Sequence, residues 1–209
     1  MANIFITGIG TDVGKTVVAA IVTEALKADY FKPVQAGDLD NSDTMTVQGL
    51  VSNTQSKFHP NSYALNTPMS PHAAAEIDGM EIELDKIVLP ATSNHLVVEG
   101  AGGILVPLNN EQTILDIIDS KYKVIVVSRH YLGSINHTLM TIQILKAKGL
   151  DVHLIFNGDE HKTTESIITR MTDVPVLGRI NEEARLDQQV IKKYADSLRS
   201  NLEQLIAAP

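Results

Sequence analysis

The stretch Gly8-Ile9-Gly10-Thr11-Asp12-Val13-Gly14-Lys15-Thr16 decides the fold of this chain. An apolar, β-branched run over residues 3–7 precedes it and predicts a strand. An apolar period of about 3.6 residues over residues 15–27 follows it and predicts a helix. A glycine-rich turn that ends in Gly-Lys-Thr between a strand and a helix is typical of the phosphate-binding loop. The sequence therefore predicts a P-loop NTPase-like fold.

The residue types in this loop suit a phosphate ligand. Glycines let the backbone wrap around phosphate oxygens, and the N–H groups at the start of the helix supply partial positive charge. Lys15 is expected to reach the β- and γ-phosphates, and the Thr16 hydroxyl to bind Mg²⁺. The usual spacing places the first glycine at position 9, which is isoleucine here, so the loop is a longer variant. The competing interpretation is a glycine-rich turn that binds no nucleotide.

Outside the loop, short β-branched runs alternate with helical periods. This alternation predicts an α/β protein with a mostly parallel sheet, helices on both faces, and one domain over residues 1–209. Further strands are predicted over residues 30–34, 95–99, 123–128, 152–157 and 175–180, and helices over residues 135–148 and 164–171. Residues 52–71 are predicted to be mostly loop. A last amphipathic helix, with apolar residues every four positions from Leu186 to Ile206, is expected to cover the sheet or to bind a partner.

Composition narrows the function classes. The 209 residues carry a formal net charge of −8, which argues against a nucleic-acid scaffold. The absence of cysteine excludes disulfides, cysteine-based zinc sites and a cysteine nucleophile. No basic segment precedes the first apolar run, and no stretch reaches about 18 apolar residues. We therefore expect a cytoplasmic protein without a membrane or nucleic-acid partner.

Charged side chains follow several predicted strands, where ligands bind in parallel α/β sheets. Lys32, before Pro33, could neutralise a transferring phosphoryl group, although a lysine there can also be a surface residue. Glu99, at the end of an apolar strand and before Gly100-Ala101-Gly102-Gly103, is a natural metal ligand or a helix-cap residue. Asp43 begins a helical segment and could be a site carboxylate or an N-cap.

The segment Leu132-Gly133-Ser134-Ile135-Asn136-His137 links a buried strand to a helix. Free N–H groups at such a helix start could bind a carboxylate, or the segment could be a plain capped start. The seven histidines form no close metal-binding pair in the sequence, so structural or solvated roles are expected for them.

Together these motifs resemble the dethiobiotin synthetase family over almost the whole chain. The motifs are the long loop ending in Val-Gly-Lys-Thr, Lys-Pro-Val, Asn-Ser-Asp, Ser-Pro-His, Val-Glu-Gly-Ala-Gly-Gly and Leu-Gly-x-Ile-Asn-His, in this order. The resemblance implies formation of dethiobiotin from 7,8-diaminononanoate, CO₂ and ATP, through a carbamate and a carbamic-phosphoric anhydride. Such chemistry needs no protein nucleophile, so catalysis would be positioning and charge stabilisation.

The resemblance also implies roles for individual residues. Lys15 and Lys32 would be catalytic, and Thr16, Asp43 and Glu99 would hold Mg²⁺. Substrate contacts would come from Thr11, Lys32, Gly133, Ser134 and Asn136, the last three from the neighbouring subunit of a homodimer whose interface contains the active site. The residues implied to bind ATP are Asp12, Val13, Gly14, Lys15, Thr16, Val17, Asp43, Glu99, Gly100, Ala101, Gly102, Asn157, Gly158 and Asn181.

Three positions depart from the family pattern. Ile9-Gly10 replaces the usual Thr-Asp of the loop, and Ala36 stands where the family often has a hydroxyl residue. Asn181-Glu182-Glu183 lacks the usual Pro-x-Leu, which leaves the nucleotide selectivity open.

Two other classes compete with this interpretation. A partitioning-type switch ATPase would carry a second lysine five residues before Lys15, where this chain has Gly10. The synthetase half of a cobalamin-pathway amidotransferase would accompany a glutaminase with a cysteine nucleophile, and this chain has neither the length nor the cysteine.

Overall fold

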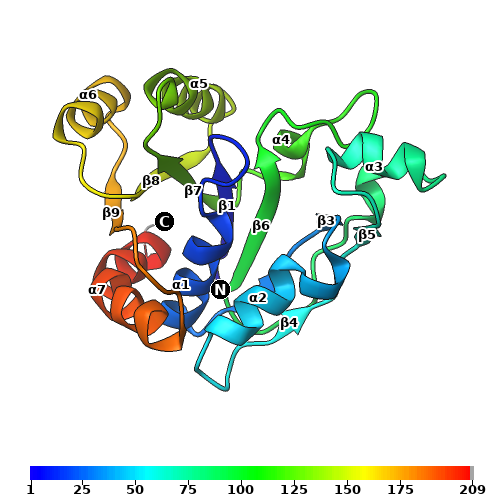
Figure 1. Cartoon of the computed structure of the whole chain (residues 1–209), viewed down its shortest axis with the longest axis horizontal. Helices are drawn as coiled ribbons and strands as arrows, with labels where there is room; N and C mark the ends of the chain where they lie inside the picture. Colours follow the sequence, from blue (N-terminus) through cyan, green and yellow to red (C-terminus); the bar gives the residue numbers. More distant parts are fainter. Residues whose placement is uncertain (208–209) are drawn as a thin grey trace.

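The computed structural model describes residues 1–207, and its main element is a parallel sheet (Figure 1). Within these residues the sheet has seven strands, all paired in parallel. In spatial order they are β4 (Phe58–His59), β2 (Asp29–Phe31), β6 (Leu96–Gly103), β1 (Asn3–Gly8), β7 (Tyr122–Arg129), β8 (Asp151–Asn157) and β9 (Val176–Ile180). The predicted α/β class with a mostly parallel sheet is confirmed.

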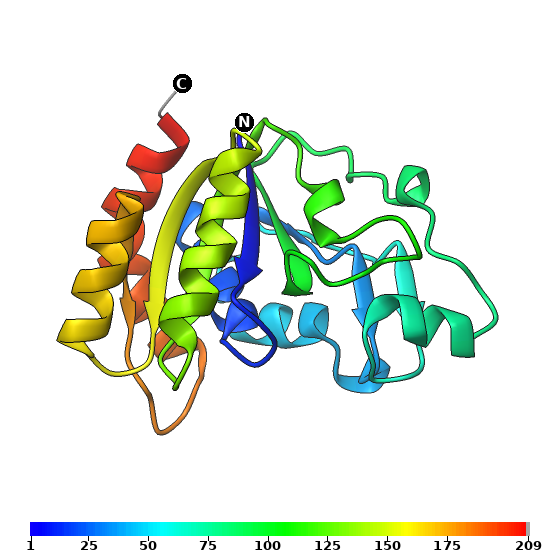
Figure 2. The same ribbon diagram turned by 90° about the horizontal axis from the view of Figure 1, so that it is seen from above.

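Helices cover both faces of this sheet (Figures 1 and 2). One face carries α1 (Lys15–Leu26), α2 (Asp43–Leu50) and α7 (Gln188–Ala207). The other carries α4 (Ile114–Ile117), α5 (Ser134–Ala147) and α6 (Lys162–Thr172). Beyond β6 lie α3 (Pro71–Ile77) and a separate two-stranded sheet of β3 (Val34–Ala36) and β5 (Tyr63–Leu65). Two 3₁₀ turns, Leu39–Asn41 and Leu84–Lys86, complete the helical elements of the described residues.

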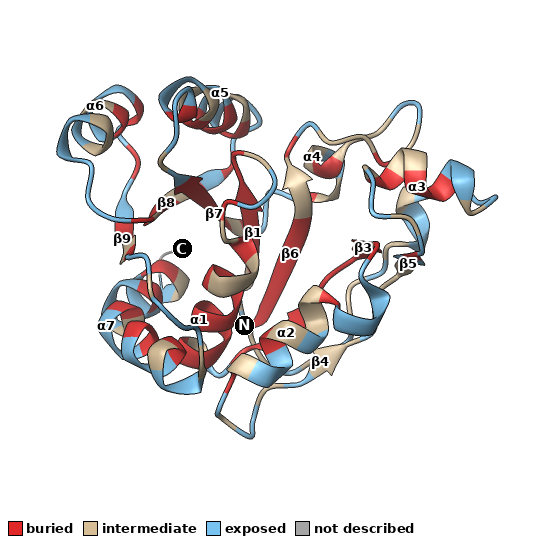
Figure 3. Ribbon diagram, in the orientation of Figure 1, coloured by how far each residue is buried: buried red, intermediate tan, exposed pale blue. Residues whose placement is uncertain are grey.

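The core lies on both sides of the central strands (Figure 3). In β7 the consecutive residues Val124 to Val127 are completely buried, because the strand is covered on both faces. The last helix, α7, buries Ile191, Leu198 and Leu202 and packs on α1 and β9. This supports the prediction of a helix that covers the sheet.

Two details of the predicted elements are wrong. Residues 30–34 are not one strand, because β2 ends at Phe31 and Val34 begins β3 in the other sheet. Pro33 between them has no N–H to donate, which favours a change of direction there. The final helix begins at Gln188, after Leu186. Residues 52–71 are mostly loop, as predicted, but they also contain the two short strands β4 and β5.

Candidate active site

The phosphate loop runs from the end of β1 into α1, at the carboxyl edge of the parallel sheet. Gly14 adopts φ +92°, and a Cβ there would lie 2.2 Å from Asn157 Nδ2. Only glycine fits this conformation and this approach without strain. Asn157, at the end of β8, donates from Nδ2 to the Val13 carbonyl at 2.8 Å and so fixes the loop. Asn157 and the loop therefore form one unit, as the prediction of a joint ATP site requires.

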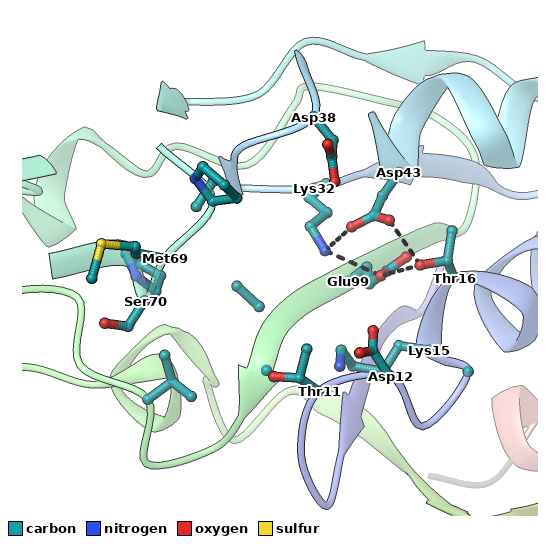
Figure 4. Close-up of a pocket in the computed structure, with 17 residues that line it drawn as sticks. Thr11, Asp12, Lys15, Thr16, Lys32, Asp38, Asp43, Met69, Ser70 and Glu99 are labelled. Carbon is teal, nitrogen blue, oxygen red and sulfur yellow. Dashed lines mark hydrogen bonds and ion pairs between the residues drawn. The ribbon is translucent and has the colours of Figure 1, made fainter. Parts of the chain in front are cut away.

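Four side chains from separate elements meet beside the loop (Figure 4). Lys32 Nζ lies 2.5 Å from Asp43 Oδ2 and 3.1 Å from Glu99 Oε1, and it is 3.5 Å from the Gly100 carbonyl. The Thr16 hydroxyl lies 3.0 Å from both Asp43 Oδ1 and Glu99 Oε1. Because this hydroxyl has one proton, it can donate to only one carboxylate at a time.

The local folding of the chain explains this meeting. In the parallel pair of β2 and β6, Phe31 is level with Val98, and Lys32 and Glu99 are the residues that follow these two buried residues. Ser42 is the N-cap of α2 and accepts from the Met45 N–H at 3.3 Å. Asp43 is therefore not the N-cap that local sequence allowed, and its carboxylate is available to Lys32 and Thr16.

The two lysines of the site have opposite electrostatics. Burial and the positive charge of Lys32 lower the pKa of Lys15 to about 8. Burial alone would lower the pKa of Lys32, but Glu99 and Asp43 outweigh it and raise this pKa. Burial alone would also raise the pKa of Asp43, yet the charge of Lys32 lowers it. The site therefore stabilises the charged form of Lys32 and destabilises the charged form of Lys15. The Lys15 Nζ donates to the Gly10 carbonyl at 2.9 Å.

A buried tyrosine completes this cluster. The Tyr30 hydroxyl donates to Glu99 Oε2 at 2.8 Å, and the residue is fully buried in β2. Burial and the nearby charges of Glu99 and Asp43 raise the pKa of Tyr30 well above its usual value, so the hydroxyl stays a donor. Sequence reasoning missed Tyr30, because a tyrosine in a predicted strand indicates only a core position.

The cluster opens into a cavity of about 690 Å³. Predicted site residues that line it are Thr11, Asp12, Gly14, Lys15, Thr16, Lys32, Asp43, Glu99, Ala101 and Gly102. Ala36, one of the departures from the family pattern, also lines it, as do Met69, Ser70 and Pro71. Figure 4 shows the loop residues on one side and Lys32 and Asp43 on the other. Val13 and Gly100 do not line this cavity; Val13 is buried in the core.

A second cavity of about 360 Å³ begins on the other side of the loop. It brings together the predicted residues Asp12, Gly14, Val17, Asn157, Gly158 and Asn181. Arg129, which sequence reasoning missed, lies here: it donates to the Asp12 carbonyl at 3.2 Å and to Glu182 Oε1 at 3.2 Å.

The C-terminal helix holds one wall of this second cavity. The Asn181 N–H donates to the Tyr194 hydroxyl at 3.2 Å, and that hydroxyl donates to Glu183 Oε1 at 2.7 Å. Lys193 pairs with the same carboxylate at 2.9 Å. The segment that lacks the usual Pro-x-Leu is thus anchored by α7.

Gly133, Ser134 and Asn136 do not join either cavity within one chain. They line a separate cavity of about 750 Å³ at the start of α5, where Gly133 is the N-cap at φ +105° and offers no side-chain acceptor. Their prediction as substrate ligands supplied by a second subunit stays a prediction.

Oxygen donors suit the predicted cation. The Thr16 hydroxyl lies 3.0 Å from a carboxylate oxygen of Asp43 and from one of Glu99, and such hard oxygen donors are the ligands that a divalent cation of this kind prefers. Among residues 1–207, no three His, Cys, Asp or Glu side chains are grouped to hold a metal by themselves. A magnesium ion here would therefore need the Thr16 hydroxyl and oxygens of a bound phosphate as well.

Comparisons with known proteins identify the family of this chain. A family model described as an AAA domain matches residues 2–190. The ATP-dependent dethiobiotin synthetase BioD of Christiangramia forsetii is 59% identical over 95% of this chain and 96% of its own length. The chain belongs to the dethiobiotin synthetase family. The synthetase of Cytophaga hutchinsonii is 47% identical over 96% of this chain and 98% of its own. Membership in a family of synthetases makes the chain an enzyme, as the sequence predicted.

A solved structure outside the synthetases shows the same fold. A Borrelia burgdorferi B31 protein named for plasmid partition, bound to AMPPNP, matches with a TM-score of 0.59 and 14% identity. The match covers 99% of this chain and 98% of the other. At this identity the likeness concerns the fold alone, so the dethiobiotin synthetase relatives outweigh the switch-ATPase alternative. In residues 1–207, no helix combines the length and apolarity needed to span a bilayer.

Proposed function

We propose that the chain catalyses ATP-dependent ring closure of 7,8-diaminononanoate with CO₂ to dethiobiotin, a step of biotin biosynthesis, with release of ADP and phosphate. The observation that carries this proposal is the joint cavity of Lys15, Lys32, Thr16, Asp43 and Glu99. Cations there can receive a polyphosphate and an anionic carbamate side by side. High identity to synthetases of this reaction along nearly the whole chain supports the assignment.

The reaction balances without a protein nucleophile. One amine of the substrate attacks CO₂ and loses a proton, which gives a carbamate. A carbamate oxygen attacks the γ-phosphorus, the bond from that phosphorus to the β,γ-bridging oxygen breaks, and ADP leaves. The second amine attacks the carbamoyl carbon of the mixed anhydride, the bond to the phosphate oxygen breaks, and a further proton is lost. The enzyme therefore has to position the reactants and stabilise charge.

The residues have distinct tasks in this sequence. Loop N–H groups and Lys15 bind the β- and γ-phosphates, for which Lys15 must leave the Gly10 carbonyl. Lys32 binds the carbamate and the transferring phosphoryl group. To do so it gives up its contact with one of its two carboxylates, and Asp43 is the more exposed of these. Thr11 and Asp12 line the same cavity, beside the amines.

The oxygens of Thr16, Asp43 and Glu99 would hold Mg²⁺ together with oxygens of the nucleotide. When bound, the ion supplies charge neutralisation at the β- and γ-phosphates. We assign Val13, Val17, Gly100, Asn157, Gly158 and Asn181 to the nucleotide site as well. Of these, Val17, Asn157, Gly158 and Asn181 line the second cavity, which fits the base. Arg129 and Glu182, which pair at 3.2 Å, line the same cavity.

The proposal extends to the assembly. Gly133, Ser134 and Asn136 would bind the substrate carboxylate from the second subunit of a homodimer. Exposed apolar side chains around this segment, among them Tyr131, Leu132 and Ile135, support its burial by another copy. We place residues 1–209 in one domain and the enzyme in the cytoplasm.

One assay tests the proposed reaction. Phosphate release from Mg·ATP is measured in bicarbonate, with and without 7,8-diaminononanoate, while dethiobiotin is followed by mass. Diamine-dependent phosphate release with the product mass is expected, and Lys15→Gln should abolish both. ATP hydrolysis at the same rate with and without the diamine would reject the substrate assignment and favour a switch ATPase. Stimulation of the hydrolysis by DNA or by lipid vesicles would then identify such an ATPase.

A further inference from the structure

Tyr30 approaches the Glu99 carboxylate from the core. In the parallel pair of β2 and β6, Tyr30 is level with Val97 and Phe31 with Val98. Side chains two residues apart on a strand share one face, so Tyr30 lies on the same face of the sheet as Val97 and Glu99. The Tyr30 hydroxyl reaches Glu99 Oε2 at 2.8 Å, while the Lys32 ammonium reaches Oε1 at 3.1 Å.

These contacts give the two carboxylate oxygens of Glu99 different partners. Oε1 faces the Thr16 hydroxyl at 3.0 Å and Lys32, both of which line the cavity. Oε2 accepts from the Tyr30 hydroxyl, and Tyr30 is fully buried and does not line the cavity. A carboxylate free at both oxygens could rotate or bind a cation through both, whereas this one offers the cavity a single oxygen.

The tyrosine ring itself is held in place. Tyr30 is completely buried, and its ring centroid lies 6.4 Å from that of Phe58 on the edge strand β4. The ring therefore fills core volume, and the hydroxyl carries the polar contact to Glu99. Packing and polar contact are thus separable, because phenylalanine retains the first and removes the second.

We propose that Tyr30 is a positioning residue, whose hydroxyl fixes Glu99 so that Oε1 alone faces Thr16 and a nucleotide-bound divalent cation. The inference rests on the proposed function, which assigns Glu99 as a metal ligand. Groups that hydrogen-bond a metal ligand orient it, and their loss typically costs about 10- to 100-fold in metal affinity. A purely structural Tyr30 would instead affect stability and leave metal affinity unchanged.

The test compares Tyr30→Phe with a matched control, Tyr122→Phe. Tyr122 is also a buried tyrosine on a strand of the sheet, 3% exposed and packed edge-on against Phe5. It lies level with Asn3 on β1, at the opposite end of the strands from Glu99, which is level with Ile6. Mn²⁺ binding in the presence of AMPPNP is measured by electron paramagnetic resonance, and AMPPNP binding is measured separately in EDTA.

Tyr30→Phe is expected to raise the Kd for Mn²⁺ about 10- to 100-fold, while Tyr122→Phe changes it less than about twofold. AMPPNP affinity in EDTA should stay unchanged in both. In a Glu99→Gln background, Tyr30→Phe should raise the Kd for Mn²⁺ little further, because its effect is exerted through Glu99. Mn²⁺ affinity within about twofold of wild type for Tyr30→Phe, or an additive effect in that background, would overturn the proposal.

Two further outcomes are also decisive. If Tyr30→Phe cannot be purified, Tyr30→Met repeats the measurement; loss of folding in both, with Tyr122→Phe intact, would make the hydroxyl structural and overturn the proposal. The titration uses no diamine. Failure of the wild-type chain to form dethiobiotin would therefore reject the proposed reaction but leave the comparison of Mn²⁺ affinities valid. Absence of Mn²⁺ binding by the wild-type chain with AMPPNP would reject the positioning role of Tyr30.

Discussion

Replacing either lysine of the site by methionine should abolish dethiobiotin formation, but the two variants should differ in stability. Lys15→Met removes a cation that burial and Lys32 disfavour. Lys32→Met removes a cation on which two carboxylates depend. The prediction is that Lys15→Met stabilises the fold and Lys32→Met destabilises it, although methionine replaces a buried lysine in both.

The structure gives the size of each effect. The pKa of Lys15 falls from 10.5 to about 8, which corresponds to about 3 kcal/mol against the charged form at neutral pH. Loss of the hydrogen bond to the Gly10 carbonyl offsets about 1 kcal/mol, which leaves a net gain of about 2 kcal/mol. Lys32→Met leaves the buried Glu99 and the half-buried Asp43 without their partner, at a cost of about 3–5 kcal/mol.

Urea denaturation at pH 7, followed by circular dichroism, measures both free energies of unfolding. The advantage of Lys15→Met should hold below about pH 8 and vanish towards pH 10.5, where the unfolded lysine also loses its proton. Adding Glu99→Gln to Lys32→Met should recover part of the loss, because it removes one unpaired charge. Destabilisation by Lys15→Met of more than about 1 kcal/mol, or a neutral Lys32→Met, would refute the electrostatic reasoning.

Three other predictions concern single positions. Glu99→Gln should raise the Mg²⁺ concentration needed for half-maximal turnover about tenfold or more, and an unchanged Mg²⁺ titration would reject its metal role. Asn157→Ala removes the hydrogen bond to the Val13 carbonyl, which contributes about 1 kcal/mol to the stability of the loop conformation. Isothermal titration calorimetry should therefore show ATP binding weakened several-fold or more, and an unchanged affinity would contradict the anchoring role of Asn157. Burial alone would raise the pKa of Asp29, but hydrogen bonds, the first from Thr92, lower it below 3.8. Asp29 therefore stabilises the fold above about pH 4, and the urea midpoints of wild type and Asp29→Asn should converge as the pH falls below that value.

Most of the fold could be predicted from the sequence because most helices and strands carry a recognisable pattern within their own residues. The glycine-rich turn, the consecutive apolar residues of β7 and the four-residue apolar period of α7 each identify their own element. The short strands β4 and β5 escaped prediction because they have two and three residues, too few for a periodic pattern. Their pairing partners in β2 and β3 lie about 25–30 residues away, and single-segment reasoning does not see such partners.

The site was predictable where chemistry needs a charged or hydroxyl side chain at a strand end. Lys32 and Glu99 follow predicted strand residues, Thr16 begins the helix after the phosphate loop, and the structure brings the three together. Arg129 also satisfies the condition, as the last residue of β7, and was overlooked. Tyr30 does not, because it lies inside β2 and its contact with Glu99 depends on which strands are neighbours in the sheet. The register of β2 against β6 carries that information, and it emerges only once the sheet is assembled.

The contacts of α7 have a consequence for experiments on the whole chain. Because Tyr194 ties this helix to Asn181 and Glu183, occupancy of the base pocket and docking of the helix are thermodynamically linked. Nucleotide should therefore slow amide hydrogen exchange within Gln188–Ala207, well away from the phosphates. The final helix should thus report whether the nucleotide site is filled, most clearly in the turns around Tyr194.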